Sequence, residues 1–139
     1  MSAPIVLDAG GLDAACDPTP SVAVRAILRA AWGGRREVLV PAVVCAELCR
    51  GAARTRRVEA ALGRVRPPFS VVVTDFGLAR QVGAVLHGAR ARSADMVDAH
   101  VVAVCALHGG GLVVTSDADD INRLAQAVPA VRIVTRPPR

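Results

Sequence analysis

The stretch "DMVDAHVVAVCALHGGGLVVTSDADD" (residues 95–120) decides the fold class of this chain. Residues 95–108 are apolar on nearly every side at helical spacing, which predicts a central helix ending at the glycines of "HGGG". Residues 111–116 form a short, continuous apolar run bounded by turn residues. That pattern is typical of a strand buried on both faces of a parallel sheet. The stretch therefore predicts a buried helix that leads directly into a central strand.

The rest of the chain repeats this alternation of short apolar strands and amphipathic helices. Strands are predicted at 5–8, 37–40, 70–74 and 131–135, and helices at 20–32, 41–51, 54–64, 75–90 and about 119–127. Such alternation indicates a parallel sheet covered by helices on both faces. We therefore expect an α/β protein, a three-layer α/β/α sandwich with a central parallel sheet of about five strands. Residues 1–139 are expected to form a single domain.

Composition limits the cellular setting and the kind of site. No apolar run approaches the roughly 20 residues that span a bilayer, and "MSAPIVLD" lacks the features of a secretory signal. We therefore expect a soluble, cytoplasmic protein that does not act at a membrane. The four cysteines form no C-x-x-C pair and no Cys/His cluster at zinc spacing, so we interpret them as buried thiols.

All 17 basic residues are arginine, and the formal net charge is +5. Guanidinium groups suit phosphate contacts, but they also suit an acidic protein partner, and a bias in codon usage would give the same count. The absence of lysine excludes receiver domains and haloacid-dehalogenase-like phosphatases, which need one. The chain also lacks the G-K-[ST] of a P-loop and the G-x-S-x-G of an acyl-transfer site.

Acidic side chains occur where the predicted strands end. Asp8 closes the first strand and Asp117 follows the fourth, so both should face the crevice at the carboxyl edge of the sheet. Helices that return to that edge can direct Glu47 and Asp98 into the same crevice. Four acids in one pocket would repel each other unless cations lay between them, and a set of oxygen ligands favours Mg²⁺ or Mn²⁺ over zinc. The sequence therefore predicts a divalent-metal site.

Each acid also has a simpler structural interpretation. Asp8 could merely begin a turn, and Glu47 could be paired with Arg50 three residues further along its helix. Asp95 could be only a cap of the central helix. Asp117, Asp119 and Asp120 could be acids at a helix N-terminus, and we expect Asp120 to be no more than that. The joint placement of four acids at one edge favours the metal site over these separate explanations.

Four motifs follow one another along the chain, "IVLDAGGL", "AELCRG", "DMVDAHVVA" and "VVTSDADDI". In this order they resemble the motifs of PIN-domain ribonucleases and, within that family, the VapC toxins of bacterial toxin–antitoxin pairs. The resemblance covers nearly the whole chain. It implies metal-assisted hydrolysis of RNA phosphodiester bonds with Mg²⁺ or Mn²⁺. The implied metal ligands are Asp8, Glu47, Asp98 and Asp117, with Asp119 as an accessory ligand. Asp95 is either a further ligand or only a helix cap.

The same resemblance implies a VapB-type antitoxin as the inhibitory partner, and a homodimer. Shortly after Glu47 the chain crowds together several arginines. We expect these side chains to face either RNA phosphates or the protein partner. They are Arg50, Arg54, Arg56 and Arg57.

One position departs from the family pattern. The family usually carries Ser, Thr or Asn two residues after the first Asp, where it helps to hold the metal site, and this chain has Gly10. Loss of such a supporting hydrogen bond typically lowers metal affinity or activity about 10- to 100-fold. Either water or Ser116 takes its place, or the chain is a weak nuclease. An alternative function therefore stays open, a PIN-like module that binds RNA or a protein partner without cutting.

Overall fold

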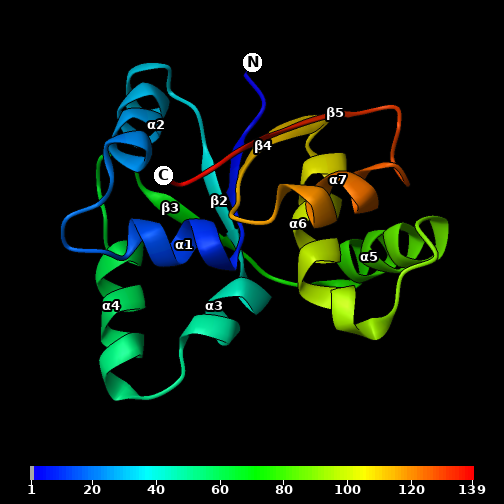
Figure 1. Ribbon diagram of the computed structural model, residues 1–139, viewed down its shortest axis with the longest axis horizontal. Coiled ribbons are helices and arrows are strands. Elements are labelled where there is room, and N and C mark those ends of the chain that lie inside the picture. The colour runs from blue at the N-terminus through cyan, green and yellow to red at the C-terminus, as the bar shows by residue number, and fades with distance from the viewer. Residues whose placement is uncertain (1) are drawn as a thin grey trace.

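In the computed structural model, which describes residues 2–139, a five-stranded sheet lies between two layers of helices (Figure 1). The strand order is β3-β2-β1-β4-β5, and every neighbouring pair is parallel. The strands are β1 (Ile5–Leu7), β2 (Val38–Pro41), β3 (Phe69–Val72), β4 (Gly110–Val114) and β5 (Arg132–Arg136). This arrangement confirms the three-layer α/β/α sandwich expected from the sequence.

Helices connect the strands and cover both faces of the sheet. Figure 1 shows α1 to α4 on one side and α5 to α7 on the other. Their bounds are α1 (Ala9–Ala15), α2 (Val22–Gly33), α3 (Ala42–Leu48), α4 (Ala52–Leu62), α5 (Phe76–Gly88), α6 (Met96–Leu107) and α7 (Ala118–Ala125), with a short 3₁₀ turn, η1 (Ser93–Asp95), before α6. None of the helices in residues 2–139 is long and apolar enough to cross a membrane.

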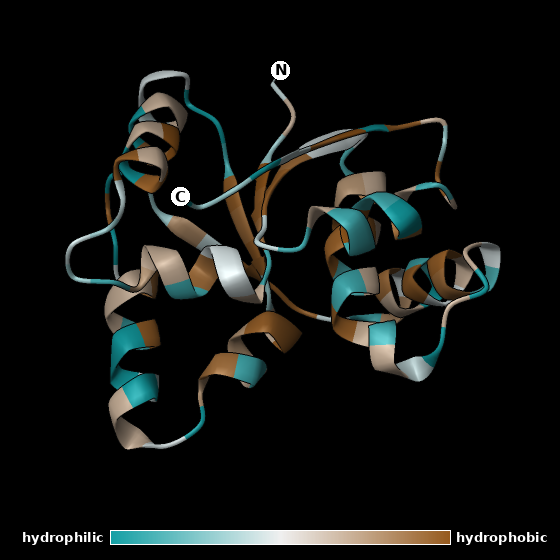
Figure 2. Ribbon diagram, in the orientation of Figure 1, coloured by the Kyte–Doolittle hydropathy of each residue, from teal (hydrophilic) through white to brown (hydrophobic). Residues whose placement is uncertain are grey.

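Helix α6 is the centre of one helical layer. It packs against β1, β2 and β4 on one side and against α5 and α7 on the others. Its residues from Ala99 to Cys105 are all buried, which explains why its sequence is apolar nearly all round. Figure 2 shows the same concentration of apolar residues in the central strands. Each fully buried Val or Leu contributes about 1.5–3 kcal/mol, so this layer is a major source of stability.

The cysteines are free thiols, but they are not all buried. Cys105 is fully buried on α6, and burial raises the pKa of its thiol to about 12. Cys16 and Cys45 are half-buried. Cys49 is exposed because α3 ends at Leu48 and the chain then turns toward solvent. The prediction of four buried thiols is therefore wrong for Cys49.

Helix α1 is the element that the sequence pattern does not predict. Its glycines suggested a turn, but Asp8 caps the helix by accepting a hydrogen bond from the backbone N–H of Gly11 at 2.8 Å. A Cβ at Gly11 would lie 2.2 Å from the carbonyl oxygen of Val114, so only glycine lets α1 lie this close to β4. The cap and the close approach together hold Asp8 at the carboxyl edge of the sheet.

Candidate metal centre

Two adjacent strands deliver the first acids to the site. β1 and β4 are paired with Leu7 opposite Val114, and Asp8 follows β1 directly. Asp117 lies three residues beyond the end of β4, at the N-cap of α7. Asp98 lies in the first turn of α6, which begins at the same edge. The topology therefore brings acids from three distant parts of the sequence to one place.

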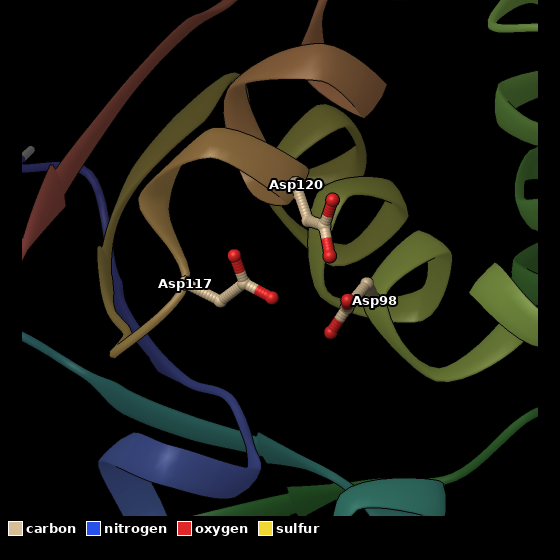
Figure 3. Close-up of side chains that lie close together, drawn as sticks. All are labelled: Asp98, Asp117 and Asp120. Carbon is tan, nitrogen blue, oxygen red and sulfur yellow. The ribbon is translucent and has the colours of Figure 1, made fainter.

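Three carboxylates form the closest cluster among the described residues. One oxygen from each of Asp98, Asp117 and Asp120 lies within 4.8 Å of the other two. Figure 3 shows Asp98 coming from α6 and the other two from the start of α7, around a common space. Three carboxylate oxygens at this separation can bind a hard divalent cation such as Mg²⁺ or Mn²⁺.

The carboxylates of the same cluster repel each other electrostatically. Burial and the nearby charges of Asp8, Asp117, Asp120 and Glu47 raise the pKa of Asp98 to about 6. Burial is the largest cause, and every named neighbour acts in the same direction because each is a like charge. Asp8 and Glu47 therefore lie within electrostatic reach of the cluster. The field of five acids favours a bound cation.

Asp8 is the most buried acid of the site, with 5% of its surface exposed. Burial raises the pKa of its carboxyl, while hydrogen bonds from the Thr115 hydroxyl and from the backbone of Gly11 and Gly10 oppose that shift. These donors stabilise the charged form of a carboxylate that would otherwise be costly to bury.

Thr115 connects the two strand ends. Its side chain is buried, its hydroxyl donates to Asp8, and its Oγ1 accepts the backbone N–H of Asp117 at 2.8 Å. One hydroxyl therefore fixes the position of both acids. Thr115 is a functional residue that the sequence motifs do not single out, although a polar residue between a buried strand and an acid is a signal for it.

Asp120 and Asp119 occupy different positions. Asp120 points into the cluster, whereas Asp119 is exposed and lies outside it. A hydrogen bond with Asp120 is the main reason that the pKa of Asp117 is raised. Consecutive residues on a helix project about 100° apart, so the two acids cannot face the same point. The sequence predicted Asp119 as the accessory ligand and Asp120 as a helix acid alone, whereas Asp120 is the one that lies in the cluster.

The sequence profile of the PIN domain family matches residues 5–127. This chain belongs to the PIN domain family. The fold of this PIN domain is similar to that of a DNA-bound VapBC from Salmonella typhimurium, at a TM-score of 0.64 and 17% identity over 96% of this chain and 98% of that chain. It is also similar to VapBC2 from Rickettsia felis bound to a promoter DNA fragment. The TM-score is 0.64 and the sequence identity 12%, over 94% of this chain and 97% of that chain. No curated protein matches the sequence.

Asp95 has a structural role in this PIN domain. Its carboxylate accepts the backbone N–H of Arg92 at 3.2 Å, which caps η1, and forms an ion pair with Arg123 at 3.1 Å. These contacts lower the pKa of Asp95. Arg123 also reaches Asp120 at 3.5 Å, so it links the cap to one member of the cluster. The exposed pair contributes little to stability, but it restricts where Asp120 can point.

Glu47 lies half-buried near the end of α3. No ion pair between Glu47 and Arg50 is found within residues 2–139. The helix ends at Leu48 rather than at residue 51, so Arg50 does not lie on the next helical turn. Pairing with Arg50 therefore does not explain why an acid occupies this position.

The arginines that follow α3 are all exposed to solvent. Arg50 lies between the helices, and the other three project from α4, whose buried side chains Val58 and Ala61 face the core. None of them enters the cluster of Figure 3. They are therefore available to a ligand or partner but do not belong to the candidate metal centre. The set is Arg50, Arg54, Arg56 and Arg57.

Gly10 leaves room for the side chain of Ser116. A Cβ at Gly10 would lie 2.6 Å from Ser116 Oγ and 3.3 Å from its Cβ. The serine at the end of β4 thus fills the space that a side chain at position 10 would use. The two positions are matched, because the side chain of Ser116 occupies the space beside Gly10.

This matching predicts a non-additive double-mutant cycle. We expect Gly10→Ser alone to destabilise the fold by about 1 kcal/mol, because Ser116 must rotate away from the new Cβ. Ser116→Ala alone should be nearly neutral, since the side chain is exposed. The double variant should recover about 1 kcal/mol relative to Gly10→Ser, measured by urea unfolding. Strictly additive effects would contradict the matching.

Proposed function

We propose that this PIN domain is a VapC-type toxin, an endoribonuclease that hydrolyses RNA phosphodiester bonds with Mg²⁺ or Mn²⁺. The observation that carries the proposal is the convergence of Asp98, Asp117 and Asp120 within 4.8 Å. Asp8 and Glu47 contribute to the same electrostatic field, which raises the pKa of Asp98 to about 6. Carboxylates gathered in this way repel each other unless a positive charge lies between them, so the cluster suits the binding of a cation.

The donor set fits a hard divalent ion, because every candidate ligand atom is a carboxylate oxygen. We assign Asp8, Glu47, Asp98 and Asp117 as the ligands. Asp120 is the fifth acid that faces the site, with Asp119 as the alternative. A bound ion would supply Lewis-acid chemistry, lowering the pKa of a water and neutralising charge on the phosphate.

The protein's own groups would hold the acids in place before the ion arrives. Thr115 forms hydrogen bonds with both Asp8 and Asp117, which sets their separation. Arg123 forms an ion pair with Asp120, which restricts the position of that carboxylate. Positioning of ligands by such hydrogen bonds is typically worth 10- to 100-fold in metal affinity or activity. The site is therefore built as a preorganised cluster.

RNA is the substrate class that fits the charges around these acids. The net charge of +5 and the exposed arginines after α3 favour a phosphate backbone, with salt-dependent affinity and little base specificity. The chain has three aromatic residues, Trp32, Phe69 and Phe76. Recognition should therefore depend mainly on phosphates and on the shape of the RNA.

A VapB-type antitoxin is the proposed inhibitory partner, because the two structures compared above are VapBC complexes that share this fold. An antitoxin arginine could pair with the acidic cluster and block it. Residues 1–139 would act as a single domain, in a homodimer, in the cytoplasm. The exposed arginines Arg50, Arg54, Arg56 and Arg57 would contact RNA or this partner.

A second function is kept open by Gly10. A PIN-like module without the usual polar side chain at that position could bind RNA or a protein without cutting. The hydrogen bond of Thr115 to Asp8 favours the active enzyme, because it supports this acid without a polar side chain at position 10. The two functions can be distinguished by one outcome, because a nuclease creates new RNA ends and a binding module does not.

Chelation provides the direct test. Pooled cellular RNA is incubated with the protein in Mg²⁺ or Mn²⁺, then with chelator, and new ends are mapped by sequencing. We expect cleavage with either ion, none with chelator, and recovery when the ion is restored. Cleavage that persists in chelator would reject the metal-dependent mechanism, and no cleavage of any RNA would favour the binding module.

A further inference from the structure

The amino edge of the sheet, opposite the carboxylates, carries two neighbouring cavities. The larger, of about 680 Å³, lies between the end of α2 and the starts of β2 and β3. The smaller, of about 330 Å³, begins at the amino ends of β4 and β5 and extends along β5 to Arg136, which pairs with Val114. Arg36 lines both, and we refer to the two cavities together as the amino-edge groove. The turn from α2 into β2, which contains Arg36, is at the upper left of Figure 1.

The groove is strongly basic. Four arginines line it, against a single acid, Glu37. Within residues 2–139 these arginines form no ion pair with an acidic side chain. Their charges are therefore available to an anion. They are Arg35, Arg36, Arg132 and Arg136.

Arg36 is held in place at the junction of the two cavities. Its Nε donates to the backbone oxygen of Ala3, while no hydrogen bond from its terminal amino groups occurs in the described part of the chain. A guanidinium fixed through Nε keeps two parallel N–H donors for a phosphate. Arg36 is thus oriented before any ligand binds.

Strand β5 adds two more arginines on a single face. Side chains alternate along a strand, so Arg132, Val134 and Arg136 project to the same side. Leu112 pairs with Val134 in the neighbouring strand, and both are only partly buried. The result is an apolar strip between two guanidinium groups, which suits a ligand that has phosphates and flat apolar rings.

Trp32 supplies a stacking surface. It lies in the last turn of α2, lines the larger cavity, and is 49% exposed. The guanidinium carbon of Arg66 lies 5.9 Å from the centre of its ring. An exposed indole beside arginines is the usual platform for an unpaired base, worth about 1–3 kcal/mol per base.

We propose that the amino-edge groove binds single-stranded RNA, with a base on Trp32 and the phosphates on Arg35, Arg36 and Arg132. This inference rests on the proposed function, which makes RNA the substrate. An acidic peptide would use the arginines but leave the indole without a partner, so RNA fits the groove better. Because the proposed contact residues lie near the amino ends of β2 and β5, away from the acids, their substitution should affect KM and leave kcat unchanged.

The binding test uses a fluorescently labelled 12-nucleotide RNA in chelator, where no metal-dependent cleavage can occur. We expect Arg35→Gln/Arg132→Gln to weaken binding about tenfold and to lower the slope of log K against log salt by about 0.7 per arginine. The control, Arg25→Gln/Arg29→Gln, changes two exposed arginines on α2 and keeps the net charge equal to that of the test variant. RNA should also quench the fluorescence of Trp32, the single tryptophan.

Several outcomes would contradict the proposal that the amino-edge groove binds RNA. These are equal weakening by the control variant, unchanged Trp32 fluorescence at saturating RNA, or displacement of RNA by a poly-glutamate peptide at the same concentration as by unlabelled RNA. The proposed nuclease function is rejected separately if the wild type cleaves no RNA in Mn²⁺ while the groove still binds RNA as expected. Cleavage with a KM that Arg35→Gln/Arg132→Gln does not raise would reject the groove and retain the nuclease.

Discussion

Replacing Asp98 with Asn should abolish RNA cleavage and, at the same time, stabilise the metal-free protein. We expect activity to fall at least about 100-fold, because a central ligand of the proposed ion is lost. At pH 7.5 without metal, the free energy of unfolding should rise by about 1–2 kcal/mol, or about 3–8 °C in Tm. Thermal unfolding in chelator measures the second effect.

The stability gain should depend on pH in a defined direction. The pKa of Asp98 is raised from 3.8 to about 6, so the folded state binds a proton more tightly than the unfolded state. The stability from that proton is fully present below about pH 4 and is lost as pH rises through 6. The advantage of Asp98→Asn should therefore be small near pH 4.5 and largest above pH 7.

The matched control is Asp13→Asn, which changes an exposed acid on α1 outside the cluster. It should leave cleavage and stability close to wild type at every pH. Loss of stability in metal-free Asp98→Asn at pH 7.5 would contradict the electrostatic account of the site. Retained cleavage would contradict the assignment of Asp98 as a ligand.

Asp120→Asn and Asp119→Asn should have very different effects on metal binding. The carboxylate of Asp120 lies in the cluster, and that of Asp119 does not. We expect Asp120→Asn to weaken Mn²⁺ binding about tenfold or more and Asp119→Asn to change it less than twofold, measured by titration calorimetry. Both substitutions remove one negative charge, so the difference reports position and not net charge.

Asp120 also contacts Arg123, so a third variant is needed. Arg123→Gln removes that ion pair and keeps the carboxylate. If Asp120 binds the ion directly, Arg123→Gln should weaken Mn²⁺ binding less than Asp120→Asn does. Strong weakening by Asp119→Asn with none by Asp120→Asn would instead support the ligand that the family resemblance implied.

Much of this architecture could be predicted because it depends on patterns along the chain. The apolar run of α6 and the short buried strands gave the parallel sheet, since burial on two faces leaves no alternation. Asp8 and Asp117 could be placed at one edge for the same reason. α1 could not be predicted, because the close approach of Gly11 to Val114 joins residues that are distant in sequence.

The details of the candidate metal site required the structure. Asp119 and Asp120 are equivalent in sequence terms, and only the rotation of α7 decides which one faces Asp98. Likewise, Arg123 pairs with Asp95 across two helices, a contact that no local spacing indicates. The end of α3 at Leu48, which separates Glu47 from Arg50, also depends on packing.

The hydroxyl of Thr115 has a consequence for how this protein folds. This hydroxyl connects the ends of β1 and β4, two strands that are far apart in the sequence. The connection forms only when Leu7 lies opposite Val114. A shift of one residue in that pairing would turn the side chain to the other face and separate the two acids. An ion that needs both acids would therefore select the correctly aligned sheet and act as a check on strand register during assembly.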